Sequence, residues 1–167
     1  FTGLICAMAP IDIQIQDTYY IVAHFHYVLV AGSLFALFAG AYFWLPKWTG
    51  HMVDERLGKW HFWTSMIFFN VTFFPMHFLG LAGMPRRYAD YPMQFADFNM
   101  VASIGAFGFG LSQMIFLWAV LKAIKGGPKA SPNYYDAQDD GLEWTVPSPA
   151  PFHTFETPPK VEWKHTH

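Results

Sequence analysis

Three apolar tracts, each long enough to cross a lipid bilayer as a helix, dominate this sequence. They cover residues 20–45, 60–84 and 98–124, and a helix needs about 20 apolar residues to span the hydrocarbon core. Lipid offers the backbone no hydrogen-bond partners, so tracts of this length must be helical. We therefore expect an all-α membrane protein with three transmembrane helices over residues 20–124. Residues 1–19 are expected to form the end of a preceding helix and a loop.

The remaining residues, 125–167, form a polar, proline-rich tail. Five prolines between residues 147 and 159 exclude regular helix or sheet there. We expect this tail to lie extended over partner surfaces, docked by Trp144, Phe152 and Phe155; a free tail is the alternative. The chain also begins at Phe1, without an initiator methionine. We interpret it as a fragment, a processed product or the second half of a split protein.

Composition narrows the classes of function. Only 13% of the residues are charged, about half the usual share for a soluble domain. The net charge is −2 and no basic stripe is present, so nucleic acid is not expected as a partner. The single cysteine, Cys6, excludes an internal disulfide framework and a cysteine-rich metal site.

Two features predict how the helices pack. Pro75 lies inside the second tract and predicts a kink near Phe74. Small residues also recur at every fourth position in the other two tracts, which allows helices to approach closely in lipid. The alternative is that small residues are simply frequent in membrane helices. The two rows are Gly32/Ala36/Gly40 and Ala102/Ala106/Gly110.

Basic residues flank the tracts unevenly and predict the orientation. Six basic residues lie on the side of the membrane that carries the first loop and the tail, whereas Arg86 and Arg87 lie on the other side. Since Lys and Arg concentrate on the cytoplasmic or matrix side, we expect the tail to face that compartment and Arg86, Arg87 and residues 12–17 to face outward. The six residues are Lys47, Arg56, Lys59, Lys122, Lys125 and Lys129.

The most informative site candidates are His24 and His26, in a tract without formal charge. Ionisable side chains at membrane depth are costly and indicate a functional site. Residues two apart on a helix point about 200° away from each other, so the two imidazoles cannot serve one metal but can serve two. Histidine is a common haem-iron ligand, and haem fits better than zinc or copper because no cysteine or carboxylate lies nearby on the helix. The alternative is a hydrogen-bonded pair that packs helices.

Charged residues near the outward end form a second group of candidates. Guanidinium groups bind carboxylates in bidentate geometry, so Arg86 and Arg87 are candidates for holding haem propionates; a solvated pair, with Asp90 as a local partner, is the alternative. Asp12 and Asp17, with Gln16, precede the first helix. Oxygen ligation of Mg²⁺ is one interpretation. For Asp17, a favourable interaction with the helix N-terminus is the stronger interpretation from the residues alone.

These residues carry a resemblance to a known family. The stretch DTYYIVAHFHYVL at residues 17–29 resembles the haem-binding helix of subunit I of the haem-copper oxidases, in the aa3-type cytochrome c oxidase branch. The similarity continues through FFPMHFLG at 73–80 and GMPRRYADYP at 83–92, and ends with LEWT at 142–145 and the prolines that follow. It covers essentially the whole chain in order.

The resemblance implies that the three tracts are the last three of twelve helices of subunit I. It implies two haem A groups, with His24 as the axial ligand of haem a3, His26 as an axial ligand of haem a, and Phe25 between the haems. Arg86, Arg87 and Asp12 would contact the haem propionates. The remaining implied site is a non-redox Mg²⁺ with Asp17 as a ligand, where Gln16 replaces the histidine usual in the family.

The resemblance also implies groups that lie outside this chain. The histidines that hold copper B, the cross-linked tyrosine, the second haem a histidine and the proton-channel glutamate belong to earlier helices. The expected partners are the N-terminal part of subunit I, subunit II with its copper centre, subunit III, cytochrome c and membrane lipid. The expected location is a bacterial plasma membrane or the mitochondrial inner membrane.

The expected function is electron transfer from cytochrome c to O₂, with reduction to water and proton pumping. This chain would be only part of the catalytic subunit. A non-catalytic di-haem b-type anchor and a haem-free membrane scaffold are the alternatives.

Overall fold

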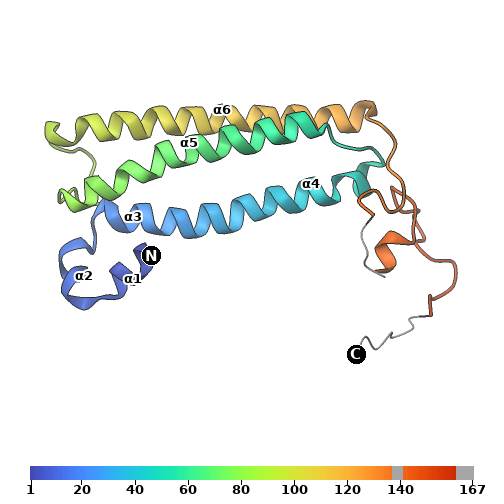
Figure 1. Cartoon of the computed structure of the whole chain (residues 1–167), viewed down its shortest axis with the longest axis horizontal. Coiled ribbons are helices and arrows are strands. Elements are labelled where there is room, and N and C mark those ends of the chain that lie inside the picture. Colours follow the sequence, from blue (N-terminus) through green and yellow to red (C-terminus); the bar gives the residue numbers. More distant parts are fainter. Residues whose placement is uncertain (137–140, 161–167) are drawn as a thin grey trace.

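Three long helices lie side by side in the computed structural model, which describes residues 1–136 and 141–160 (Figure 1). The first runs without a break from Tyr19 to Thr49, the second from Glu55 to Leu81 and the third from Met93 to Gly126, and all three are long and apolar enough to cross a membrane. The elements are α1 (Thr2–Ala7), α2 (Ala9–Ile15), α3 (Tyr19–His26), the π-helix η1 (Tyr27–Leu34), α4 (Phe35–Thr49), α5 (Glu55–Leu81), η2 (Met93–Phe95), α6 (Ala96–Gly126) and η3 (Leu142–Trp144). The prediction of an all-α membrane protein with three spans is confirmed.

The first long helix has clear end signals and an irregular middle. The hydroxyl of Thr18 accepts a hydrogen bond from the Tyr20 amide at 3.2 Å, which caps the first turn. At the other end the helix continues through Pro46 and stops at Gly50, whose φ of 75° is readily adopted by glycine. Between them, η1 follows directly after His26. Short π-helical segments often occur at functional sites.

The second and third helices pack through small residues. A Cβ at Gly105 would lie 2.5 Å from the Thr72 amide nitrogen, so only glycine permits this approach of α6 to α5. Near the middle of the same contact the Ser65 and Ser112 hydroxyls are 2.8 Å apart and buried. Of the predicted packing rows, Ala102 is buried, whereas no atom lies within 4 Å of a Cβ built at Gly32 or Gly110.

The first and second helices meet at the end of the bundle that carries Arg86, which we call the Arg86 end. A Cβ at Gly80 would lie 2.0 Å from the Tyr20 amide nitrogen, so α5 and α3 are in backbone contact there. Buried Leu79, Met84 and Phe95 form a small core beside it. Pro75, where a kink was predicted near Phe74, lies inside α5, whose helical assignment is unbroken from Glu55 to Leu81.

The tail returns to the opposite end of the bundle, which we call the tail end (Figure 1). The Lys47 ammonium is buried and donates to the Pro132 and Val146 carbonyl oxygens, each at 2.9 Å. Trp144 is buried, and its ring centroid lies 5.5 Å from the Lys47 Nζ. Docking of the tail through Trp144 is therefore seen within the chain itself, whereas Phe152 is 96% exposed.

Candidate functional site

His24 lies in the last turn of α3 and is positioned by α1. Its Nδ1 shares a hydrogen bond of 2.8 Å with the hydroxyl of Thr2. Gly3 follows in the same turn of α1, and a Cβ there would lie 3.1 Å from Cε1 and 3.6 Å from Nε2 of His24. One ring nitrogen is therefore held by a hydroxyl. The absence of a side chain at Gly3 leaves space beside the other nitrogen.

His26 is positioned by its own helix and by α5. Its Nδ1–H donates to the Val22 carbonyl oxygen at 2.7 Å, which leaves the Nε2 lone pair available. The ring stacks on Phe73 of α5, with centroids 4.3 Å apart and planes inclined by 14°, and on Phe25 at 4.5 Å. A backbone carbonyl bound to one nitrogen is the usual way in which a metal-binding histidine is oriented. Since His24 contacts α1 and His26 contacts α5, the two rings lie on different sides of the helix.

Two other histidines within the bundle differ from this pair. In His61, both ring nitrogens are occupied: the Tyr42 hydroxyl donates to Nδ1 at 3.1 Å, and Nε2–H donates to the Gln113 amide oxygen at 3.2 Å. In His77, Nε2 has no partner but is fully enclosed, and the ring packs against Tyr20. Both side chains therefore have a structural role within the bundle. Among the histidines of the described bundle helices, only His24 and His26 combine a fixed Nδ1 with an Nε2 that is unpaired and not enclosed.

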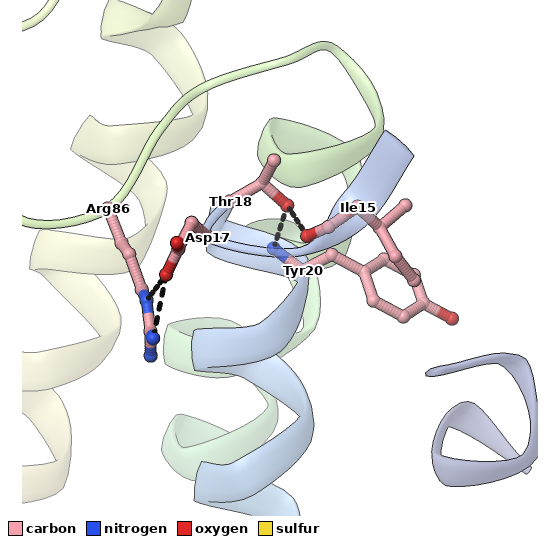
Figure 2. A network of polar contacts seen from close by, with 5 residues as sticks. All are labelled: Ile15, Asp17, Thr18, Tyr20 and Arg86. Carbon is pink, nitrogen blue, oxygen red and sulfur yellow. Dashed lines mark hydrogen bonds and ion pairs between the residues drawn. The ribbon is translucent and has the colours of Figure 1, made fainter. Parts of the chain in front are cut away.

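Arg86 and Asp17 form an ion pair at the Arg86 end, shown in Figure 2. The Arg86 Nε and terminal nitrogen lie 2.9 and 2.8 Å from the same Asp17 carboxylate oxygen. The backbone joins the same segments, because the Arg86 amide donates to the Asp17 carbonyl oxygen at 2.9 Å and the Tyr19 amide to the Met84 carbonyl oxygen at 3.0 Å. The pairing thus fixes the α5–α6 loop to the start of α3. Sequence reasoning did not foresee that these two candidates would bind each other.

The other charged candidates are less constrained. Arg87 is exposed and has a φ of 67°, a conformation that is uncommon for a side-chain-bearing residue. Asp12 lies half-buried in the first turn of α2, and Gln16 is exposed just after that helix. The Asp90 carboxylate accepts from the Tyr91 amide at 2.8 Å. In the described residues no three histidine, cysteine, aspartate or glutamate side chains converge as a metal site, so a cation at Asp17 would need ligands from elsewhere.

An apolar cavity lies away from the two histidines. It encloses about 600 Å³ between α4, α5 and the tail, and its walls are mostly aromatic and aliphatic, with Tyr42 and His61 among them. It is separate from the rings of His24 and His26, which are not part of its lining. The positioning groups Thr2, Gly3 and the Val22 carbonyl were missed by sequence reasoning, because nothing in their spacing indicates contact with an imidazole.

Comparison with known proteins gives the family. The sequence profile described as "Cytochrome C and Quinol oxidase polypeptide I" matches residues 1–108, a stretch that contains both histidines and both arginines. The chain belongs to this family. The resemblance found in the sequence is therefore confirmed at the level of the family.

Individual relatives extend the match into the tail. The "Cytochrome c oxidase subunit 1" of Cereibacter sphaeroides is 48% identical over 162 residues, which are 96% of this chain and 29% of that protein. Two proteins named "Putative cytochrome c oxidase subunit 1-beta" are also similar over 162 residues: 48% identical in Streptomyces avermitilis and 46% in Streptomyces coelicolor. The chain spans less than a third of the length of these relatives.

Proposed function

We propose that this chain forms the haem-binding helix and its neighbours in the catalytic subunit of a cytochrome c oxidase. His24 would be the axial ligand of haem a3 and His26 an axial ligand of haem a. The observation that carries the proposal is the paired geometry of the imidazoles: each has Nδ1 fixed and Nε2 unpaired, and the two rings lie on different sides of one helix. Haem iron, when bound, would supply the electron-transfer and oxygen chemistry.

The groups around His24 and His26 would hold the two imidazole rings in place and limit their contact with water. The Val22 carbonyl fixes the tautomer of His26, because Nδ1 must carry the proton to donate to it. Phe73 and Phe25 cover the faces of that ring, which limits water around it. The Thr2 hydroxyl orients the His24 ring through its hydrogen bond with Nδ1 and, because a hydroxyl both donates and accepts, allows either tautomer. Phe25 would lie in the short path between the two haems.

The charged residues of the Arg86 end would bind the haem propionates and a Mg²⁺ ion. Arg86 and Arg87 would bind propionate carboxylates, with Asp12 near those of haem a3. Since Arg86 is already paired with Asp17, we propose that it shares its guanidinium between Asp17 and a propionate. Asp17 would ligate Mg²⁺ through its second oxygen, with the amide oxygen of Gln16 in place of the family's histidine.

The complete activity requires groups that this chain does not contain. Copper B and the second ligand of haem a would come from the N-terminal part of subunit I, and subunits II and III would complete the complex. With these, the assembly would transfer electrons from cytochrome c to O₂, reduce it to water and pump protons. The tail end would face the cytoplasm or matrix of a bacterial or mitochondrial respiratory membrane.

Substitution of each histidine in the assembled complex tests the proposal. His24→Ala should abolish O₂ reduction and the high-spin haem signal, while the low-spin signal remains. His26→Ala should instead remove the low-spin signal. His153→Ala, an exposed tail histidine, is the matched control and should change neither.

The reduced-minus-oxidised spectrum of the unaltered complex separates the alternatives. Bands of haem A support the oxidase, bands of haem b indicate a di-haem anchor, and an absence of bands indicates a scaffold. Equal loss of one and the same haem signal in both histidine variants would overturn the assignment of the two ligands to two haems.

A further inference from the structure

A small cavity at the end of α6 combines an apolar wall with two lysines. It is an open hollow of about 260 Å³, lined by Trp118, Leu121, Lys122, Lys125 and Gly126. The two lysines lie three residues apart in the last turns of the helix, on neighbouring positions of one face. Trp118 lies one turn before Lys122, toward the middle of the span, and is 59% exposed. The cavity therefore offers apolar surface on the bilayer side and positive charge at the helix end.

The charge of the cavity is not balanced within the described chain. Lys122 is occupied, because its ammonium lies 2.5 Å from the Asp54 carboxylate. Asp54 in turn caps α5 by accepting from the Arg56 and Leu57 amides. Lys125 has no ion pair in the residues that the structure describes, and it is exposed. One ammonium group thus remains free beside the apolar wall.

The depth of the cavity identifies the chemistry of a ligand. The helix of the third candidate span is 34 residues long and ends at Gly126. Since about 20 residues cross the hydrocarbon core, we place Lys122 and Lys125, in its last turns, at the level of the headgroups, with Trp118 at the boundary where tryptophan is enriched. Basic pockets at the ends of membrane helices attract anionic lipid headgroups. A small water-soluble anion has no apolar part to contact Trp118 and Leu121. An anionic phospholipid has both a phosphate, which matches the lysine at the helix end, and an acyl chain, which matches the apolar wall on the bilayer side.

We propose that this cavity binds one anionic phospholipid, with its phosphate at Lys125 and an acyl chain along Leu121 and Trp118. Lys122, held by Asp54, forms the side of the site toward α5. This site is independent of the haem-ligand assignment, because it involves neither histidine and lies at the opposite end of the bundle. Its failure would leave the proposed function unaffected, and the reverse also holds.

The test measures lipid binding to the purified, assembled complex. The complex is exchanged into nanodiscs of phosphatidylcholine containing a small fraction of spin-labelled phosphatidylglycerol, and the motionally restricted fraction is measured by electron paramagnetic resonance. Loss of one cation near an anionic headgroup should weaken binding about fivefold. Lys125→Gln should therefore reduce the affinity of the phosphatidylglycerol probe about fivefold, and Lys129→Gln, an exposed lysine outside the cavity, should change it less than twofold.

A second pair of variants tests the apolar wall. Trp118→Ala should weaken binding of the same probe, whereas Trp63→Ala, which removes an equally exposed tryptophan of α5, should not. Spin-labelled phosphatidylcholine should respond to neither lysine variant. Equal effects of Lys125→Gln and Lys129→Gln would indicate diffuse surface charge and overturn the site, as would equal binding of both probes or no restricted probe in the unaltered complex.

Discussion

Gly80→Ala is the substitution that should most directly disturb the helix that carries the two histidines. The added Cβ would lie 2.0 Å from the Tyr20 nitrogen and 2.6 Å from its Cα. Ordinary van der Waals contact begins near 3.4 Å, so α5 and α3 must separate by about 1.4 Å at this point. The obstructing atoms belong to the backbone and the Cβ, so no rotamer change can relieve the clash.

The cost of this change follows from the packing. Inserting a methyl group into a tight interior costs about 1–3 kcal/mol, and we expect the upper end because two backbones are in contact. For a chain of this size, about 3 kcal/mol lowers a thermal midpoint by roughly 6–12 °C. The separation would also strain the Tyr19–Met84 backbone hydrogen bond and the Asp17–Arg86 ion pair that fix the start of α3.

The assay is the temperature at which the purified complex loses its haem absorbance. Gly110→Ala is the matched control, since no atom of the chain lies within 4 Å of a Cβ there and alanine is the better helix former by about 1 kcal/mol. We expect a fall in the midpoint for Gly80→Ala and no fall for the control. If Gly80→Ala melts at the temperature of the unaltered complex, the backbone contact between α3 and α5 does not hold this end together.

Two further predictions concern the tail end. Lys47→Met should leave the Pro132 and Val146 carbonyl oxygens without their donor, at a cost of about 1–3 kcal/mol. Limited proteolysis should then cleave the tail roughly five- to 150-fold faster, and Lys59→Met, which changes an exposed lysine, is the unaffected control. The hydrogen bond from Lys122, with those from the Leu57 and Arg56 amides, holds the pKa of Asp54 below its ordinary value. The stabilising effect of Asp54 should therefore be present above its unfolded pKa near 4 and be lost as the pH falls through its lower folded value. A thermal midpoint measured from pH 6 to pH 3 should show this loss, and Asp54→Asn should remove it; an identical pH profile in the variant would exclude Asp54 as the group responsible.

The sequence predicts the large features well because they depend on local composition. The length of each apolar tract is enough to indicate a span, and the cost of burying His24 and His26 in lipid is enough to indicate a site. Trp144 also signalled that the tail docks, because a tryptophan in a polar, proline-rich segment is costly to leave exposed. These inferences need no knowledge of which residues meet in space.

What the sequence could not predict depends on contacts between distant residues. Lys47 was counted among the loop charges that set the orientation, yet the returning tail buries it. Arg86 and Asp17 were assigned separate ligands, yet they pair with each other across 69 positions. The glycines that bring helices together are Gly80, Gly105 and Gly108 rather than the regular rows. Each of these depends on the relative rotation of two helices, which a single-chain pattern does not contain.

The π-helical segment from Tyr27 to Leu34 has a consequence for changes in chain length. A π-helix uses more residues per turn than an α-helix, so this segment holds surplus chain between the histidines and α4. Removing one residue there lets the segment return toward α-helix, whose larger rotation per residue offsets most of the rotation lost with the deleted residue. Lys47 would therefore still reach the tail carbonyls that receive it. A single deletion should accordingly be tolerated in this stretch, whereas the same deletion inside the regular helix of α4 before Lys47 would turn that lysine by about 100°.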